Sequence, residues 1–331
     1  MFLHRACRCL LLIDSFCDFF LANFFLLRQY LCILFMLRLR FCLNVLHWFL
    51  ILQKRMRTRM KTSPHRRKHR RRAFRRLFWL LVLATLLLLL WPRRVTLDGL
   101  NSPHAILLRA DSGEVLAEKD ADSTIYPASM TKMMTALLAI EANPDLDTPV
   151  TLPEEIFPAL QAQNASLAGF QPGETATVRD LLYGAMLPSG AECCEALARE
   201  VSGSEEAFVA RMNQRAKELG CTSTSFTCVH GLYDYGNVSS AHDLALIAKA
   251  CAENETYMQV ANTLSYTLPA TNLHQNERTI TSTNLMLNPE YPYYRDYIRG
   301  MKTGFTTLAG RCYVTFAQKD GHTYGLVVLG S

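Results

Sequence analysis

Ser129 and Lys132 are the residue pair with the clearest capacity for chemistry, in the stretch YPASMTKMMTALLAIE (Tyr126–Glu141). Methionine and leucine recur at helical spacing behind the serine, so we expect a helix to begin at Ser129. Residues at i and i+3 share one face of a helix, so the hydroxyl and the amine can meet there. A serine hydroxyl is a poor nucleophile until a base removes its proton. The pair is therefore a candidate for a serine nucleophile with a lysine base, and the rest of the sequence must decide.

Ser-x-x-Lys by itself has a simpler interpretation, a capping serine followed by an exposed lysine, because the pattern arises about once by chance in a chain of this length. Two further stretches favour catalysis. LLYGAMLPSGAECCEALA places Ser189 after an apolar helix, and IRGMKTGFTTLAG places Lys302, Thr303 and Gly304 at the end of a strand. These three motifs, in this order, are typical of penicillin-recognising serine enzymes.

Lys132 can act as a base only when its amine is neutral, so its pKa must fall well below about 10.4. Burial among the neighbouring methionines and leucines lowers a lysine pKa, and so does repulsion from a second cation. Lys302 is the natural candidate for that cation. The same chemistry requires donors for the developing oxyanion but no metal or other cofactor.

The elements that must position these residues follow from hydrophobic periodicity. HAILLRADSGEVLAEKDAD predicts two strands around the turn Asp111-Ser112-Gly113. Residues from about 145 to 255 are mostly helical in pattern, and SEEAFVARMNQRAKELG is a clear amphipathic helix ended by Gly220. Strands resume in SYTLPA, YIRGMKTG, RCYVTFAQK and HTYGLVVLG. We expect an α/β protein of the α+β type, in which N- and C-terminal strands pair in one antiparallel sheet with helices packed on it and a helical lobe between.

Charge divides the chain into a basic leader and an acidic body. Residues 1–94 hold 20 Lys and Arg against 2 Asp and Glu, whereas the remaining 237 residues hold 15 against 27. A basic segment at 56–76 is followed by an apolar run at 77–91, which predicts a cytoplasmic flank and a signal anchor. The anchor would hold the body, residues 95–331, on the extracytoplasmic side of the cell membrane. Secretion after signal cleavage is the alternative, and the apolar run makes a nucleic-acid partner for the basic segment unnecessary.

Residues 1–55 are apolar but interrupted by charges, and we interpret them as a doubtful extension upstream of a start at Met56 or Met60. The body has six cysteines, none with zinc-ligand spacing, and small buried thiols are the favoured interpretation over a Cys221–Cys228 disulfide. His230 and His242 are interpreted as loop or core histidines, and Asp243 as a helix cap.

The body resembles the serine D-alanyl-D-alanine carboxypeptidases, the low-molecular-mass penicillin-binding proteins of the β-lactamase-like superfamily. The resemblance covers about residues 104–331, through successive blocks that match in order. The blocks are YPASMTK, GETATVRDLLYGAMLPSG, FVARMNQRAKELG, VHGL, SSAHDLALIAK and KTGFTTLAG. It implies penicillin-sensitive hydrolysis of the terminal D-Ala-D-Ala bond of peptidoglycan stem peptides.

The resemblance also implies roles for individual residues. Ser129 would form the acyl-enzyme, Lys132 would be its base, and Ser189 would relay a proton to the leaving amine. Stem peptides and β-lactam antibiotics are the expected ligands, and water would hydrolyse the acyl-enzyme without a metal.

Substrate binding is expected at the Lys-Thr-Gly strand. Lys302 and Thr303 would hold the terminal carboxylate of the substrate, and Gly304 would let its backbone lie against the strand edge. The backbone N–H groups of Ser129 and Phe305 would form the oxyanion hole.

The sequence departs from the family pattern in two places. The second motif is usually Ser-x-Asn, whereas here it reads Ser189-Gly190-Ala191. The chain also stops at GLVVLGS, before the arginine and the sheet-packing helix of family members, so we expect a fragment that lacks its C-terminal helix. Both departures keep a non-catalytic peptidoglycan- or penicillin-binding protein open as an alternative. A β-lactamase is less favoured, because no Glu-x-x-Leu-Asn segment is present to activate a deacylating water.

Replacing Ala191→Asn restores the amide that would donate to the substrate's peptide carbonyl. One oriented donor contributes about 3 kcal/mol to a transition state, so we expect on the order of a hundredfold faster acylation or turnover. Stopped-flow acylation by a chromogenic penicillin measures this, and a variant no faster than the parent would contradict the prediction.

Overall fold

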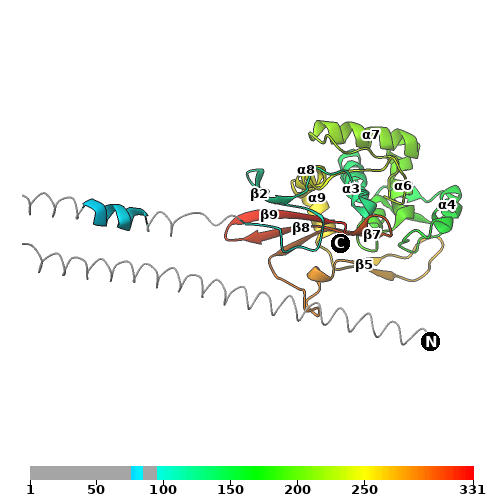
Figure 1. The fold of residues 1–331 in the computed structure, drawn as a ribbon. Coiled ribbons are helices and arrows are strands. Elements are labelled where there is room, and N and C mark those ends of the chain that lie inside the picture. The colour runs from blue at the N-terminus through cyan, green and yellow to red at the C-terminus, as the bar shows by residue number, and fades with distance from the viewer. Residues whose placement is uncertain (1–75, 85–94) are drawn as a thin grey trace, which may run out of the picture. The chain divides into compact units, whose positions relative to one another are not determined.

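The computed structural model describes residues 76–84 and 95–331 (Figure 1). Residues 76–84 are helical. The doubtful extension 1–55, nearly all of the basic segment 56–76 and the later part of the predicted anchor 77–91 lie outside the described residues. Within the described ranges, no helix combines the length and the apolar character needed to cross a membrane.

An antiparallel sheet of order β2-β1-β9-β8-β7 forms the framework of the body. The N-terminal strand β1 pairs with β9, with Ala105 opposite Val328, which confirms the predicted pairing between the two ends of the body. Strand β7 is at the end of the order and has β8 as its partner, with Lys302 opposite Val314. The strands are β1 (His104–Arg109), β2 (Glu114–Lys119), β7 (Ile298–Thr306), β8 (Gly310–Lys319) and β9 (His322–Leu329).

Two short hairpins lie outside this sheet, β3 (Pro149–Thr151) with β4 (Thr175–Thr177), and β5 (Ser265–Leu268) with β6 (Arg278–Thr281). Of these strands, sequence periodicity predicts only β5. Three or four residues are too few for an alternating pattern to stand out, so the interpretation of residues 145–255 as mostly helical missed β3 and β4.

Helices α8 and α9 pack against the main sheet, and the other helices form the lobe beside it (Figure 1). The helices are α3 (Thr131–Ala142), α4 (Phe157–Ala162), α5 (Val178–Met186), α6 (Ala191–Ser202), α7 (Glu205–Glu218), α8 (Ala241–Ala252) and α9 (Glu255–Ala261), with 3-10 turns η1 (Ala128–Met130), η2 (Glu154–Ile156) and η3 (Leu285–Leu287).

Local sequence signals fix several helix ends. A capping box between Thr177 and Asp180 starts α5, and the Ser204 side chain caps α7. Gly220, with φ +87°, follows α7 as predicted. The interpretation of Asp243 as a cap was wrong, because Ser240 caps α8 and the Asp243 carboxylate instead accepts hydrogen bonds from the loop at 222–224.

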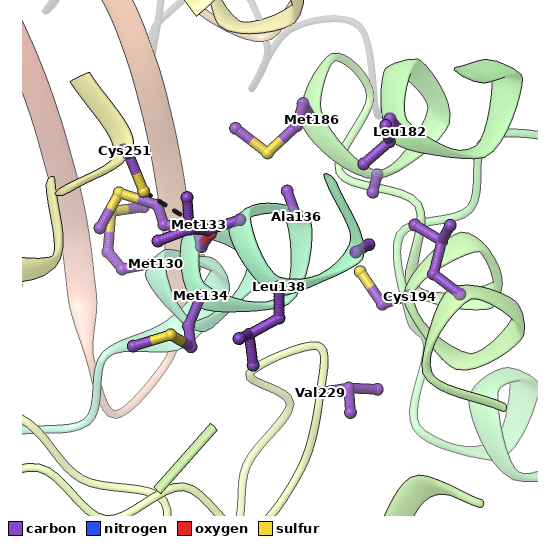
Figure 2. Close-up of a cluster of buried hydrophobic side chains, with 14 of the residues drawn as sticks. Met130, Met133, Met134, Ala136, Leu138, Leu182, Met186, Cys194, Val229 and Cys251 are labelled. Carbon is purple, nitrogen blue, oxygen red and sulfur yellow. Dashed lines mark hydrogen bonds between the residues drawn. The ribbon is translucent and has the colours of Figure 1, made fainter. Parts of the chain in front are cut away.

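Helix α3 is the centre of the core. Every residue from Thr131 to Ala139 is buried, so the helix is enclosed on all sides rather than amphipathic. Figure 2 shows Leu182 and Met186 of α5, Cys194 of α6, Cys251 of α8 and the loop residue Val229 arranged around it. The Cys251 thiol donates to the Met133 carbonyl at 3.7 Å. A helix held from every side presents its first turn in one fixed position.

The described cysteines are all free and buried, which confirms their interpretation as small core residues and leaves Cys221 and Cys228 unbridged. His230 is a buried loop residue, as expected. His242 lies instead in the first turn of α8, where its Nδ1 is 3.0 Å from Asp122 Oδ1. The residue type of His242 did not indicate that α8 had already begun at Ala241.

The turn after His230 packs directly on the first turn of the core helix. Gly231 has φ +77°, and a Cβ atom added to it would lie 1.8 Å from the Ala128 carbonyl oxygen. Ala128 itself has φ +47°, a left-handed conformation uncommon for alanine. The absence of a side chain at Gly231 therefore permits the close approach of two backbone segments.

Gly231→Ala is expected to lower the free energy of unfolding by about 3 kcal/mol, from about 1 kcal/mol of backbone strain and about 2 kcal/mol of overpacking. Gly220→Ala is the matched control, because Gly220 has φ +87° but no neighbour within 4 Å of the added Cβ. Chemical denaturation of both variants measures the difference. If both variants lose the same free energy of unfolding, the close approach of Gly231 to Ala128 contributes nothing to the loss.

Candidate active site

Ser129 lies in the 3-10 turn η1, immediately before α3, rather than at the first residue of an α-helix as predicted. The left-handed backbone at Ala128 explains the difference, because an α-helix cannot extend back through it. The Ser129 side chain meets two partners. Its Oγ is 3.2 Å from Lys132 Nζ and 3.0 Å from Ser189 Oγ. Three residues that the sequence singled out for catalysis are thus in direct contact.

Lys132 is buried to 2% exposure, and its Nζ donates to the His230 carbonyl oxygen at 2.6 Å. Burial lowers the pKa of Lys132, because the apolar core disfavours the charged amine. The nearby Glu192 carboxyl acts in the opposite direction. The hydrogen bond to His230 fixes one N–H of the amine, so that the nitrogen stays directed at Ser129.

Lys302 is the second buried cation of the site, at 1% exposure. Burial first, and repulsion from Lys132 second, lower the pKa of Lys302 to about 7. Its Nζ donates to the Thr303 carbonyl oxygen at 2.9 Å. Coulomb repulsion is reciprocal, so two enclosed amines near one another favour the loss of one proton from the pair.

Ser189 does not cap helix α6, which was its simpler interpretation. Gly190 occupies the N-cap position and no side chain caps the helix, whereas the Ser189 hydroxyl donates to Ser129 Oγ. Ser189 has φ +69°, a strained conformation for a residue with a side chain. Gly190 permits the tight turn, because a Cβ there would lie 2.8 Å from Ala168 Cβ and 2.9 Å from the Gly184 oxygen.

The Lys-Thr-Gly segment runs along β7, the last strand of the sheet, and passes close to η1. A Cβ added to Gly304 would lie 3.1 Å from the Ser129 backbone nitrogen and 2.9 Å from Met130 Cε. Any side chain there would fill the space beside the nucleophile. Phe305 follows with an exposed side chain, at 66% exposure. The two backbone N–H groups predicted for an oxyanion hole therefore come from adjacent segments.

Some residues of this region escaped sequence reasoning. Thr283, exposed after β6, has its Oγ1 2.6 Å from Thr303 Oγ1, and its N–H donates to the Leu187 oxygen just before the Ser189 turn. Asn237 is buried and donates to Thr131 Oγ1. A threonine in an irregular segment and a backbone carbonyl such as that of His230 carry no motif, so only the fold reveals them.

Ala191 begins α6 with a buried methyl group where the family pattern has an asparagine amide. Within the described residues, Glu195, Glu205 and His230 form a group with the donor types of a metal site, and their candidate ligand atoms lie within 4.8 Å of one another. None of these three carries the nucleophile or touches Ser129 Oγ, so the serine chemistry does not depend on them as ligands.

A family model described as D-alanyl-D-alanine carboxypeptidase, peptidase family S11, matches residues 93–331. The chain belongs to this family. The match confirms the resemblance inferred from the sequence blocks, and the observed sheet and helices agree with the expected fold.

Individual relatives agree with the carboxypeptidase family. The chain is 35% identical over 236 residues to D-alanyl-D-alanine carboxypeptidase DacF of Bacillus subtilis, covering 70% of this chain and 58% of the relative. It is 36% identical to DacC of Escherichia coli, covering 68% of this chain and 56% of the relative. The chain thus spans little more than half of these two proteins.

Among solved structures, the Streptomyces K15 DD-transpeptidase superposes with a TM-score of 0.66 at 31% identity, over 72% of this chain and 92% of that one. The shared fold is that of the penicillin-recognising DD-peptidases.

The lowered pKa of Lys302 predicts a dependence of stability on pH. Between pH 7 and about 10.5 the unfolded lysine binds more protons than the folded one, so stability rises with pH across this window and is lost as pH falls towards 7. Lys302→Met removes the titrating group. We expect the variant to lack most of this rise between pH 7 and pH 10, measured by chemical denaturation. A rise as steep as that of the parent would contradict the assignment.

Proposed function

We propose that this protein hydrolyses the terminal D-Ala-D-Ala bond of peptidoglycan stem peptides through an acyl-enzyme on Ser129. The observation that carries the proposal is the contact of one partly exposed serine hydroxyl with a buried lysine amine at 3.2 Å and with a second serine hydroxyl at 3.0 Å. A nucleophile, a base and a proton relay are then within one hydrogen-bonded group. Membership of the carboxypeptidase family supports the same reaction.

Acylation begins with proton transfer from Ser129 to Lys132. Burial favours the neutral amine, which is the form that accepts the proton. Ser129 Oγ attacks the carbonyl carbon of the penultimate D-alanine, and negative charge develops on the carbonyl oxygen. The backbone N–H groups of Ser129 and Phe305 stabilise that charge, and Gly304 leaves room for the reacting group between them.

Departure of the terminal D-alanine requires a proton on its nitrogen. Ser189 Oγ, hydrogen-bonded to Ser129 Oγ, donates its proton to the leaving nitrogen as the C–N bond breaks, and the proton held by Lys132 replaces it, so that Lys132 is neutral again. Water then attacks the ester carbonyl carbon while Lys132 takes a proton from it, and Lys132 gives that proton to Ser129 Oγ as the ester C–O bond breaks. Each step uses side chains of this chain alone.

Substrate recognition is assigned to the free edge of β7. An extended peptide adds to this edge through main-chain hydrogen bonds, while Lys302 and Thr303 receive the terminal carboxylate. The charged form of Lys302 provides the attraction, and the contact of Thr303 with Thr283 orients its hydroxyl. β-Lactam antibiotics, whose amide and carboxylate match this arrangement, are the expected inhibitors.

The location of the reaction is part of the proposal. Its support is the basic segment 56–76 followed by the apolar run 77–91, which favours anchoring in the cell membrane with the body outside, where peptidoglycan lies. Release by signal cleavage would place the same body in the same compartment.

Covalent labelling with a fluorescent penicillin tests the nucleophile. We expect the purified chain to form a long-lived adduct at pH 7.5, Ser129→Ala to form none, and Ser265→Ala, an exposed serine on β5, to label like the parent. Circular dichroism confirms that all three are folded. Release of D-alanine from a synthetic peptide ending in D-Ala-D-Ala then measures the carboxypeptidase reaction.

Two other outcomes would each favour a different function for this protein. Rapid turnover of penicillin without a stable adduct would favour a β-lactamase. A folded parent that binds stem peptide, is neither labelled nor active, and loses no affinity on Ser129→Ala would favour a non-catalytic binding protein.

A further inference from the structure

Two carboxyls and an imidazole gather beside the segment that holds Lys132, and their candidate ligand atoms lie within 4.8 Å of one another: Glu195 and His230 are buried, and Glu205 is half-buried. Glu195 of α6 is 5% exposed, and His230 is 7% exposed. His230 Nε2 is 3.5 Å from Glu195 Oε1, and Glu205 at the start of α7 accepts from the Val229 N–H at 3.2 Å through its Oε1. The proposed reaction assigns no role to either glutamate.

This group has the donor types of a metal site, but the tautomer of His230 opposes that use. The Leu232 N–H donates to His230 Nδ1 at 3.2 Å, so Nδ1 holds a lone pair. A neutral imidazole then carries its proton on Nε2, the atom that faces Glu195. Nε2 has no lone pair to offer a cation, and Arg199 already occupies the other Glu195 oxygen. The arrangement suits a proton instead.

The charges around the two carboxyls favour one shared proton. Glu195 faces Glu205 on α7, Arg199 on its own helix and His230 from the loop. Further titratable groups around this cluster are the Cys194 and Cys228 thiols and Lys132 of α3. Burial, followed by the like charge of Glu205, raises the pKa of Glu195 to about 7. Burial lowers the pKa of His230 to about 3, so the imidazole is neutral. One arginine balances one carboxylate, and the second carboxyl keeps its proton.

The carboxyls hold the segment that in turn holds Lys132. Glu205 accepts from the Val229 N–H, and Glu195 Oε1 lies 3.5 Å from Nε2 of the His230 ring. On the opposite side, Lys132 Nζ donates to the His230 oxygen at 2.6 Å and Thr135 Oγ1 donates to the Val229 oxygen at 2.6 Å. Residues 229–230 therefore connect the two carboxyls to Lys132, the proposed base.

We propose that Glu195 and Glu205 share one proton and act as positioning residues for Lys132, through the His230 carbonyl. With the proton present, the two carboxyls hydrogen-bond to each other and hold residues 229–230 against α3. When the proton is lost, the buried Glu195 carboxylate and the half-buried Glu205 carboxylate repel each other, and the carbonyl that orients the Lys132 amine is displaced. This deepens the proposed function and rests on it where acylation is the readout.

Stability against pH tests the shared proton without reference to the reaction. Between pH 4.5 and 7 the folded pair holds a proton that unfolded glutamate releases, so stability falls as pH rises through this window. Glu195→Gln keeps the shape and an acceptor oxygen but does not titrate. Chemical denaturation of the full chain gives an unfolding equilibrium constant for each protein. The constant of the parent divided by that of Glu195→Gln should rise more than tenfold between pH 5 and pH 7.

The matched control is Glu200→Gln, on the exposed face of the same helix α6. We expect its stability to follow the parent at every pH. Equal pH dependence of the parent and Glu195→Gln would overturn the shared proton. Stoichiometric binding of Zn²⁺ to the parent, measured calorimetrically and lost in Glu205→Gln, would also overturn it in favour of a metal site.

The second readout is the rate constant for acylation by a fluorescent penicillin at pH 7 and pH 9. Loss of the Glu195 acceptor in Glu195→Ala should slow acylation at least tenfold at pH 7, and Glu195→Gln should restore most of it. Only the parent loses the shared proton above pH 7. The ratio of the acylation rate constant of Glu195→Gln to that of the parent should therefore rise several-fold from pH 7 to pH 9. Titration of Lys302 slows acylation in both proteins, so the ratio isolates the carboxyl pair.

The outcomes separate this inference from the proposed function. A parent that is never acylated would refute the serine chemistry while leaving the stability experiment intact. A parent that is acylated, with Glu195→Ala and Glu195→Gln equal to it at both pH values, would refute the positioning role alone.

Discussion

The constraint on which the site depends is the enclosure of two lysine amines inside an apolar core. Lys132 and Lys302 are both almost fully buried, although lysine is among the residues least often found inside proteins. Removing the charged form from water is costly, so the protein favours a neutral amine at neutral pH. The all-round burial of α3 and the packing of β7 against η1 create that environment. The core therefore tunes the chemistry as well as stabilising the fold.

Two strained backbone positions lie at the same place. Ala128 and Ser189 both have positive φ. Ala128 immediately precedes Ser129, and Ser189 donates its hydroxyl hydrogen to Ser129 Oγ. Gly231 and Gly304 permit close approach from two further segments. Each unfavourable conformation persists only because the surrounding packing leaves no alternative. Three segments distant in sequence, those of Ser189, Gly231 and Gly304, thus converge on the turn that carries Ser129, and the strained backbone accompanies this close approach.

Much of this could be predicted from the sequence, for identifiable reasons. Ser129, Lys132 and Lys302 stand in short motifs, and the strands at the two ends of the body have strong alternating patterns. The 3-10 turn at Ser129 and the twisted backbone at Ser189 were not predictable, because positive φ at a residue with a side chain results from tertiary packing. Asp243 was assigned to a cap because residue type alone did not reveal its partners across the loop at 222–224. The His230 carbonyl and Thr283 have no sequence signature at all.

The open edge of β7 has a consequence for the behaviour of the protein in solution. A strand with one unpaired edge is a template for any extended chain, including another copy of the same protein, and edge strands usually carry prolines or outward charges that prevent such pairing. The segment from Lys302 to Thr306 has neither defence, because its lysine points into the core, and Phe305 and Leu308 beside it are exposed. An edge that is open to a peptide ligand can also pair with the same edge of a second molecule. The feature that permits ligand binding along this strand therefore also favours self-association.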